Sequence, residues 1–366
     1  MAGSTYGNLF KITSWGESHG KALGVVVDGC PAGLPLCEED IQIFLDRRKP
    51  GQNKFSTQRK ESDTVEILSG VFEGQTTGTP ISMMVRNTDQ RSRDYGEIAV
   101  SYRPGHADYT FDQKYGFRDY RGGGRSSGRE TIGRVAGGAI ACKILQNLGI
   151  TLITYTKAIG SVEAKTFDYK HIAEDPLYMP DAEASKKAAA YLEECIKEQD
   201  SSGGLVECLV KGLPAGLGDP VFDKLDALLG QAIFSIGAVK AVEIGDGIAV
   251  SHLRGSQDND GFQMDSKGQI FKTSNHAGGI LGGISDGSDL ILRAHFKPTP
   301  SIASPQQTIN TKGENITLSI KGRHDPIIAP RAVVVVESMT AITLVNALLS
   351  GMGARIDYLK KVWDPS

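Results

Sequence analysis

One helical segment that is apolar on nearly every side constrains the fold of this chain more than any other feature. Residues 331–349 are mostly Val, Ala, Leu and Ile, with polar residues such as Glu337 and Asn346 scattered between them. A helix that is hydrophobic all round is normally buried, and the polar interruptions argue against a membrane span. We therefore expect a helix that lies between other layers of the protein.

A second apolar helix is predicted at residues 131–148, and the predicted strands come in groups rather than in strict alternation with helices. Such groups favour antiparallel sheets and an α+β fold. The two apolar helices fall in corresponding places of the two halves, each after a loop rich in glycine, arginine or histidine. This hints at an internal duplication within a single domain of residues 1–366, although no residue-by-residue repeat accompanies it.

Helical spacing and end signals predict further helices at residues 38–48, 182–197 and 220–231. Residues 255–272 are rich in Asp, Gly, Ser and Gln, and we expect a mobile lid there. Residues 275–285 form a second glycine-dense loop with helix potential.

The overall charge gives no reason to expect a polyanionic partner. The 366 residues include 40 Lys and Arg against 43 Asp and Glu, a net charge of −3, so there is no general attraction to nucleic acid. The five cysteines include no Cys-x-x-Cys pair, which suggests neither a disulfide framework nor a zinc site. Because no signal-peptide pattern begins the chain, we expect a cytoplasmic protein with no membrane or nucleic-acid partner.

Candidate ligand-binding residues are most concentrated at residues 119–130, Asp-Tyr-Arg-Gly-Gly-Gly-Arg-Ser-Ser-Gly-Arg-Glu. Glycine lets backbone N–H groups approach a ligand, and arginine offers a fork of donors to phosphate or carboxylate. The helix that follows directs its N-terminus to the same place. We interpret the segment as an anion site; the alternative is a flexible surface turn, and RNA-binding Arg-Gly segments differ because they repeat.

Three loop histidines, His19, His106 and His324, accompany further basic residues along the chain. Imidazole exchanges protons near neutral pH, so histidine beside phosphate-binding arginine suggests general acid catalysis to a departing phosphate. The sequence has no P-loop, Gly-x-Ser-x-Gly or His-Glu-x-x-His motif, and its glycine loops do not read as a Rossmann fingerprint. The residues alone therefore indicate an enzyme acting on a small polyanion.

Six blocks of sequence, taken together and in order, resemble the chorismate synthase family over nearly the whole chain. They are residues 15–20 (Trp-Gly-Glu-Ser-His-Gly), 46–51 (Asp-Arg-Arg-Lys-Pro-Gly), 102–108 (Tyr-Arg-Pro-Gly-His-Ala-Asp), 119–130, 275–283 (Asn-His-Ala-Gly-Gly-Ile-Leu-Gly-Gly) and 322–326 (Gly-Arg-His-Asp-Pro).

The resemblance implies a carbon–oxygen lyase of the shikimate pathway that converts 5-enolpyruvylshikimate 3-phosphate to chorismate by 1,4-anti elimination of phosphate. It implies a need for reduced FMN without net redox change, with NADPH as the reductant in members that reduce FMN themselves. We expect a separate flavin reductase here. The implied fold is a β-α-β sandwich with helices packed between two antiparallel sheets, assembled as a homotetramer.

The resemblance also implies roles for single residues. His19 matches the histidine that protonates the leaving phosphate, with Ser18 beside it; His106 matches the histidine that serves the flavin ring, and Asp325 an aspartate close to the flavin. The matched flavin positions are Arg125, Ser126, Ser127, Gly237, Ala238, Gly282, Lys297, Pro298, Thr299, Pro300, Ser301 and Arg323, and the matched substrate and NADPH positions are Arg48, Lys54 and Arg129.

Two positions depart from the usual pattern of the family. Lys54 stands where many members have arginine, which removes bidentate recognition, and Pro300 stands where serine is usual. Two other functions stay open on the residues alone. One is a flavin oxidoreductase acting on a phosphosugar, which would consume nicotinamide; the other is a nucleic-acid-binding module with steep salt dependence.

Overall fold

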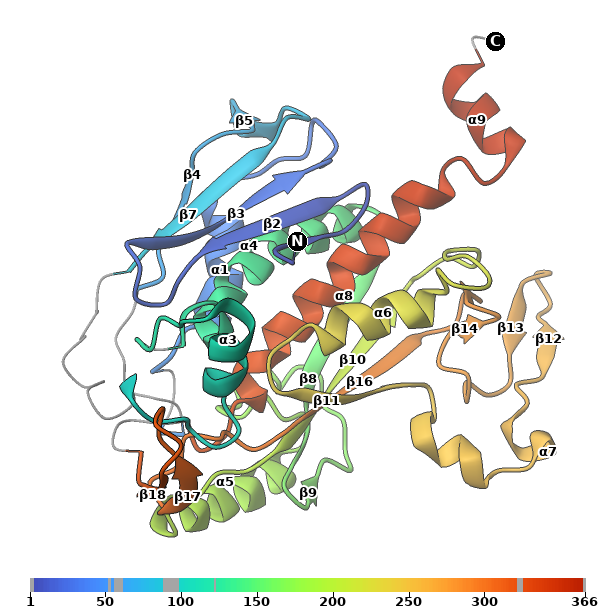
Figure 1. The fold of residues 1–366 in the computed structure, drawn as a ribbon. Coiled ribbons are helices and arrows are strands. Elements are labelled where there is room, and N and C mark those ends of the chain that lie inside the picture. Colours follow the sequence, from blue (N-terminus) through green and yellow to red (C-terminus); the bar gives the residue numbers. More distant parts are fainter. Residues whose placement is uncertain are drawn as a thin grey trace.

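Two five-stranded antiparallel sheets and a group of long helices make up the body of the protein (Figure 1). The computed structural model describes residues 3–51, 54–55, 62–87, 99–121, 123–320 and 325–364. The predicted α+β class is confirmed, because every strand pairing within these two sheets is antiparallel and no helix connects two parallel neighbouring strands of either sheet.

The first sheet comes from the N-terminal part of the chain, and the second from the part after residue 150. The first has the order β1 (Thr5–Tyr6), β2 (Lys11–Gly16), β3 (Ala22–Asp28), β7 (Ile81–Arg86) and β4 (Val65–Ile67). The second has the order β11 (Val239–Ile244), β16 (Leu290–Phe296), β10 (Gly204–Lys211), β8 (Thr151–Ile159) and β9 (Val162–Glu163).

Side-chain alternation sets which face of the second sheet meets the helices. In β10, Val206, Cys208 and Val210 are buried on one face, while Glu207 points to the other. In the paired strand β16, Leu292 lies opposite Cys208 and Arg293 lies opposite Glu207. Since strand residues alternate between faces, one face becomes apolar and covers a helix, and the other carries ion pairs.

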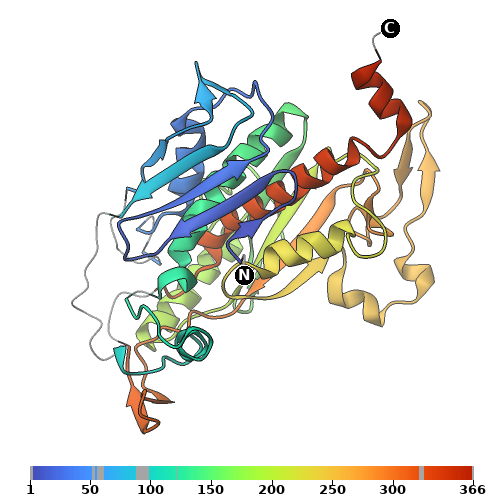
Figure 2. The same ribbon diagram turned by 45° about the horizontal axis from the view of Figure 1, so that its top comes forward.

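Helix α8 (Ala329–Gly351) is the buried central helix that the sequence predicts. It packs against α4 (Thr131–Asn147) on one side and against β8 and β10 on the other, and Figures 1 and 2 show it running between the two sheets. Its residues from Val333 to Val345 are all buried. By length and composition α8 is the one described helix that could cross a membrane, but 89% of its most apolar window is buried inside the protein.

Glycines in α4 allow this helix to lie close to its neighbours. Gly133 and Gly137 are four residues apart and therefore share a face; a Cβ on Gly137 would lie 2.7 Å from Ile12 of β2. On another side, a Cβ on Gly138 would lie 2.1 Å from the Cβ of Ser338 in α8. The short residues thus bring α4 into direct backbone contact with both layers.

Helices α1 (Glu38–Arg48) and α6 (Leu225–Phe234) pack against α8 as well. A partly buried ion pair joins α1 to the middle of α8, since Arg47 donates to both carboxylate oxygens of Glu337 at 2.9 and 2.7 Å. Two donors on two acceptors fix both the angle and the distance between the helices.

The remaining elements lie around this body. They are α3 (Asp108–Tyr115), η2 (Gly124–Ser126), η3 (Gly128–Glu130), α5 (Ala182–Lys197), η4 (Gly247–His252), α7 (Gly255–Asp258) and α9 (Ile356–Trp363), with the hairpins β5 (Val71–Phe72) with β6 (Gln75–Thr76), β12 (Phe262–Met264) with β13 (Ile270–Lys272), β14 (Ile280–Leu281) with β15 (Ile284–Ser285), and β17 (Gln306–Ile309) with β18 (Asn315–Leu318).

Two elements differ from those that the sequence predicts. The sequence predicts helix potential at residues 275–285, but residues 280–285 form the β14–β15 hairpin, and Gly278, Gly279, Gly282 and Gly283 all have φ between 61° and 90°. A right-handed helix excludes positive φ. Helix α6 begins at Leu225 rather than at residue 220, because the N–H of Leu225 donates to the carbonyl of Gly283 at 2.8 Å.

We expect Gly138→Ala to lower the free energy of unfolding by about 1–3 kcal/mol, because the added methyl overlaps Ser338 in a packed core. Chemical denaturation measures the change. Gly230→Ala in α6 is the matched control, since nothing lies within 4 Å of its added Cβ; it should leave stability unchanged or raise it by up to about 1 kcal/mol. Equal effects of the two substitutions would contradict the close α4–α8 contact.

Candidate active site

His19 lies in a tight turn between β2 and β3. The N–H of Gly20 donates to the carbonyl of Glu17 at 3.0 Å, so Ser18 and His19 occupy the two central positions of a four-residue turn. The hydroxyl of Ser18 lies 3.0 Å from Nδ1 of His19, and both side chains are buried. The turn and the hydroxyl together give the imidazole one defined orientation.

The glycine-rich loop docks onto the end of β2 through Arg125. Its Nη1 donates to the carbonyl of Gly16 at 3.0 Å, and its Nη2 donates to the carbonyl and hydroxyl of Ser14 at 3.2 and 2.7 Å. All three acceptors are neutral. Among the described residues, therefore, Arg125 brings a positive charge beside the His19 turn without a carboxylate to offset it.

The two serines after Arg125 are used inside the loop. Ser126 donates to the carbonyl of Gly123 at 2.7 Å. The hydroxyl of Ser127 accepts from the N–H of Arg129 at 3.4 Å and caps the short helix η3. These contacts shape the turn that leads into α4.

A buried carboxylate, Asp63, holds two arginines from different parts of the chain. Arg48 at the end of α1 donates to Oδ2 of Asp63, and Nη2 of Arg129 lies 3.1 Å from Oδ1. Burial lowers the pKa of Arg48 to about 10 against the opposing effect of Asp63. Its buried Nε has no hydrogen-bond partner among the described residues, so this donor could serve a bound anion.

A third arginine, Arg331 at the start of α8, joins the same group. Its Nε donates to the backbone carbonyl of Arg48 at 3.2 Å, and its Nη1 donates to Asp325 at 2.5 Å. The pKa of Arg48 is lowered further by the charge of Arg331. Among the described residues, three guanidinium groups thus share two carboxylates, which leaves this part of the cluster with a net positive charge.

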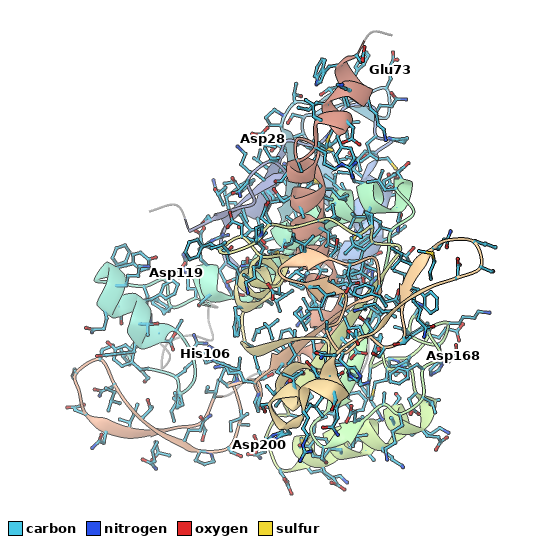
Figure 3. The ribbon with its side chains drawn as sticks, turned by 90° about the vertical axis from the view of Figure 1, so that its right-hand side faces the viewer. Asp28, Glu73, His106, Asp119, Asp168 and Asp200 are labelled. Atoms are coloured by element: carbon cyan, nitrogen blue, oxygen red, sulfur yellow. The ribbon has the colours of Figure 1, made fainter. Side chains whose placement is uncertain are left out.

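His106 lies in a turn that packs against the segment after β16. Its Nε2 is 2.7 Å from the hydroxyl of Ser301. Lys297 donates to the carbonyl of Gly105 at 2.7 Å, and Pro300 lies so close to Gly105 that a Cβ there would be 2.8 Å from it. Figure 3 shows His106 and Asp119, the first residue of the glycine-rich loop, on the same side of the molecule.

The segment that follows β16 also meets Gly237 and Ala238. The N–H of Lys297 donates to the carbonyl of Ala238 at 3.0 Å. Ala238 has φ of 72°, and open space surrounds the position where Gly237 would carry a Cβ. Burial, with a contribution from Lys240, lowers the pKa of Lys297.

A cavity of about 140 Å³ is lined by Ser301, the hydrogen-bond partner of His106, and by Asp325, the ion-pair partner of Arg331. Asp200 and its neighbours line it as well. Thr299, in the same segment, has a buried hydroxyl with no partner among the described residues. The described lining contains no basic residue, but His106 and Arg331 contact two of its members, Ser301 and Asp325.

Comparisons with known proteins agree on one family. The family model described as chorismate synthase matches residues 10–349. The chorismate synthase of Lachnoclostridium phytofermentans is 66% identical over 99% of this chain and 100% of its own length. The chain belongs to the chorismate synthase family.

Relatives and a solved structure extend this result. The chorismate synthase of Agathobacter rectalis is 66% identical over 98% of each chain, and that of Methanosarcina mazei is 54% identical over 95% of this chain and 97% of its own. A crystal structure of a chorismate synthase superposes with a TM-score of 0.77 at 32% identity, covering 98% of this chain and 97% of the other. The predicted family and its reaction class, a lyase of the shikimate pathway, are confirmed.

Two of the predicted site residues, Lys54 and Gly282, stand apart from the other chorismate synthase motifs. Lys54 is mostly exposed and pairs with Glu193 of α5, with its ammonium 5.0 Å from the ring of Phe55. Gly282 is in the β14–β15 hairpin, beside the start of β16, whereas Lys297 follows its end; a strand of this length separates them by about 20 Å. Arg323 lies outside the described residues.

Sequence reasoning missed three residues of this network: Asp63, Asn87 and Arg331. Asn87 accepts from Arg129 at 3.2 and 2.8 Å and donates to the His19 turn. One feature of the sequence could have identified Arg331, because a charged residue at the start of a buried apolar helix needs a partner. No such feature marks Asp63 and Asn87, because neither belongs to a recognisable motif.

We expect Asp63→Asn to lower the free energy of unfolding by about 3–5 kcal/mol at pH 7, because it leaves two buried guanidinium groups without their shared carboxylate. Burial would raise the pKa of Asp63, but Arg48 and Arg129 more than offset this and lower it. A depressed folded-state pKa gives stability that is present above the unfolded value, about 3.9, and is lost as pH falls through the folded value.

The difference in free energy of unfolding between Asp63→Asn and the unchanged protein should therefore become smaller as the pH falls below about 4. Denaturant titrations at pH 7 and pH 3.5 measure it. Asp28→Asn is the control, since its pair with Lys11 is exposed and 3.8 Å long; it should change stability by less than about 1 kcal/mol. An equal loss of stability at both pH values would contradict the conclusion that the buried carboxylate of Asp63 is ionised.

Proposed function

We propose that this protein removes phosphate from 5-enolpyruvylshikimate 3-phosphate by 1,4-anti elimination and releases chorismate. The observation that carries the proposal is the series of contacts from the His19 turn, through Asn87 and the three arginines, to the cavity beside His106. The series connects two candidate proton-transfer groups, His19 and His106, through the arginine cluster and the residues that line the cavity. Membership of the chorismate synthase family supports the reaction itself.

The substrate carries one phosphate and two carboxylates, and the cluster of basic groups suits it. Arg48, Arg129 and Arg331 surround Asp63 and Asp325, while Arg125 and Lys297 meet only neutral acceptors among their described contacts. Charge-assisted hydrogen bonds contribute about 1.5–3 kcal/mol each. We assign the three clustered arginines to substrate binding, where they also stabilise the phosphate as it departs.

Reduced FMN fits the wall formed by Ala238 and residues 297–301. The orphaned hydroxyl of Thr299, the ammonium of Lys297 and the open space beside Gly237 supply a donor set and room for a flavin. When bound, reduced FMN supplies electron density to the substrate ring without net redox change. The protein's part is to hold the two ligands together and exclude water.

The flavin positions at Lys297 and Gly282 bear on the assembly. In a single copy they are at opposite ends of β16, and a second copy of the chain that supplies Gly282 would bring both to one flavin. This supports the proposed homotetramer.

We further propose that the layered arrangement of sheets and helices is the β-α-β sandwich of the family. We also propose that the enzyme works in the cytoplasm and that a separate reductase supplies its reduced FMN.

Proton transfer is assigned to the two turn histidines. His19, oriented by Ser18, holds the proton that the leaving phosphate receives. His106, oriented by Ser301, serves the flavin side of the cavity. Asp325 forms an ion pair with Arg331 at the cavity wall, so it keeps that guanidinium directed toward the substrate.

We expect His19→Ala and His106→Ala each to lower turnover by about 10²- to 10⁴-fold, the usual contribution of a general acid or base. Substrate and FMN binding should largely persist, because the arginines and residues 297–301 are unchanged. Anaerobic single-turnover kinetics measure the effect, with His252→Ala, an exposed histidine in η4, as the control. Near-normal rates in both variants would remove these assignments.

The reaction class is tested by counting reducing equivalents. Anaerobic incubation with 5-enolpyruvylshikimate 3-phosphate and reduced FMN should yield chorismate and phosphate in equal amounts, with no NADPH consumed per turnover. If an outside reductase is the natural source, photoreduced FMN should support the reaction, whereas oxidised FMN supplied with NADPH should not. Stoichiometric NADPH oxidation would indicate an oxidoreductase instead.

A further inference from the structure

The side chain of Asn87 is placed at the centre of the site but belongs to none of the motifs that identify the family. It follows β7 and continues the ladder with β3, since its N–H donates to the carbonyl of Lys21 at 3.1 Å. Its side-chain amide then turns toward the loop between β2 and β3. The strand pairing therefore fixes the backbone from which this amide extends.

The Nδ2 of Asn87 holds both ends of the His19 turn. It donates to the carbonyl of Glu17 at 3.1 Å and to the carbonyl of Gly20 at 2.8 Å. These are the first and last residues of the four-residue turn, which is closed by its own 3.0 Å backbone hydrogen bond. One amide group thus holds together the two ends of the turn that contains Ser18 and His19.

The Oδ1 of Asn87 faces the opposite way and accepts from Arg129. The two contacts, from Nε and Nη2, are 3.2 and 2.8 Å long. A guanidinium has only donors, so Arg129 fixes the orientation of the amide and leaves its NH₂ group for the turn. Arg129 is itself held by Asp63, which also binds Arg48.

We infer that Asn87 is a positioning residue, which sets the place of His19 relative to the arginines that bind the leaving phosphate. It joins the proton donor and the phosphate site through one rigid amide, so the distance between them does not depend on the flexibility of the turn. The inference rests on the proposed role of His19. Misplacing a catalytic group by about 1 Å can cost on the order of 10²-fold in rate.

The test is a double-mutant cycle with His19, measured as kcat and KM under anaerobic conditions with reduced FMN. Asn87→Ala should lower kcat by about 10- to 100-fold, with KM changed by less than about threefold because Asp63 still holds Arg129. In the His19→Ala background, Asn87→Ala should have almost no further effect on kcat, since it acts through the missing imidazole.

Asn346→Ala is the matched control. Its amide also donates to two backbone carbonyls, those of Phe10 and Ile342 at 2.8 and 3.0 Å, but it braces the loop between β1 and β2. Both alanine variants should lose thermal stability, whereas only Asn87→Ala should lose turnover. If Asn87→Ala does not fold, Asn87→Gln, which displaces the amide by one methylene, should show the same selective loss of kcat in smaller measure.

Several results would overturn the inference. Losses that multiply in the double mutant would mean that Asn87 acts independently of His19, and a large rise in KM would place its effect on Arg129 and binding. A normal kcat in Asn87→Ala would also exclude a positioning role for Asn87. Full turnover in His19→Ala would reject the role of His19 together with that of Asn87, whereas loss in His19→Ala with an unaffected Asn87→Ala rejects only the latter.

Discussion

The buried carboxylate of Asp63 is the interaction on which the organisation of the site depends. It is fully enclosed and lies between Arg48 at the end of α1 and Arg129 at the start of the α4 region. A guanidinium can be buried only when its charge is met. Asp63 therefore allows two cations to be held away from water, where their interaction with an anionic ligand is stronger than at the surface.

The packing of the helices makes this arrangement possible. Gly133, Gly137 and Gly138 let α4 lie against β2 on one side and α8 on another, and the Arg47–Glu337 pair fixes α1 relative to α8. The ends of α1, α4 and α8 consequently meet at one edge of the body. Arg48, Arg129 and Arg331 are at or near those ends, so the core that stabilises the fold also brings the charges together.

The sequence predicted the fold class and the long helices well, because their signals are local. The apolar character of α8 and the capping signals of α1 and α5 are complete within each segment. It failed for residues 275–285, where four glycines permit positive φ and only the contacts with β16 and α6 decide the conformation. Local propensity is overridden by tertiary contacts at such positions.

For the site, the histidines and the glycine-rich loop were recognised from residue type and family resemblance. The contacts of Asn87 and Asp63 could not be predicted in this way, since each joins segments that are far apart in sequence and neither residue is unusual in its local setting. Asp63 is 15 residues from Arg48, and its left-handed backbone, with φ of 46°, has no sequence signal beyond the tolerance of Asp for that region.

The position of Arg331 has a consequence for the order in which the enzyme can become active. This arginine binds the backbone of Arg48, 283 residues earlier in the chain, and Asn346 of the same helix holds the segment before β2. The first sheet therefore acquires its full helical support only when α8 has docked. Because contacts so distant in sequence form late, we expect the guanidinium cluster to be completed late in folding, after the local hairpins of the first sheet.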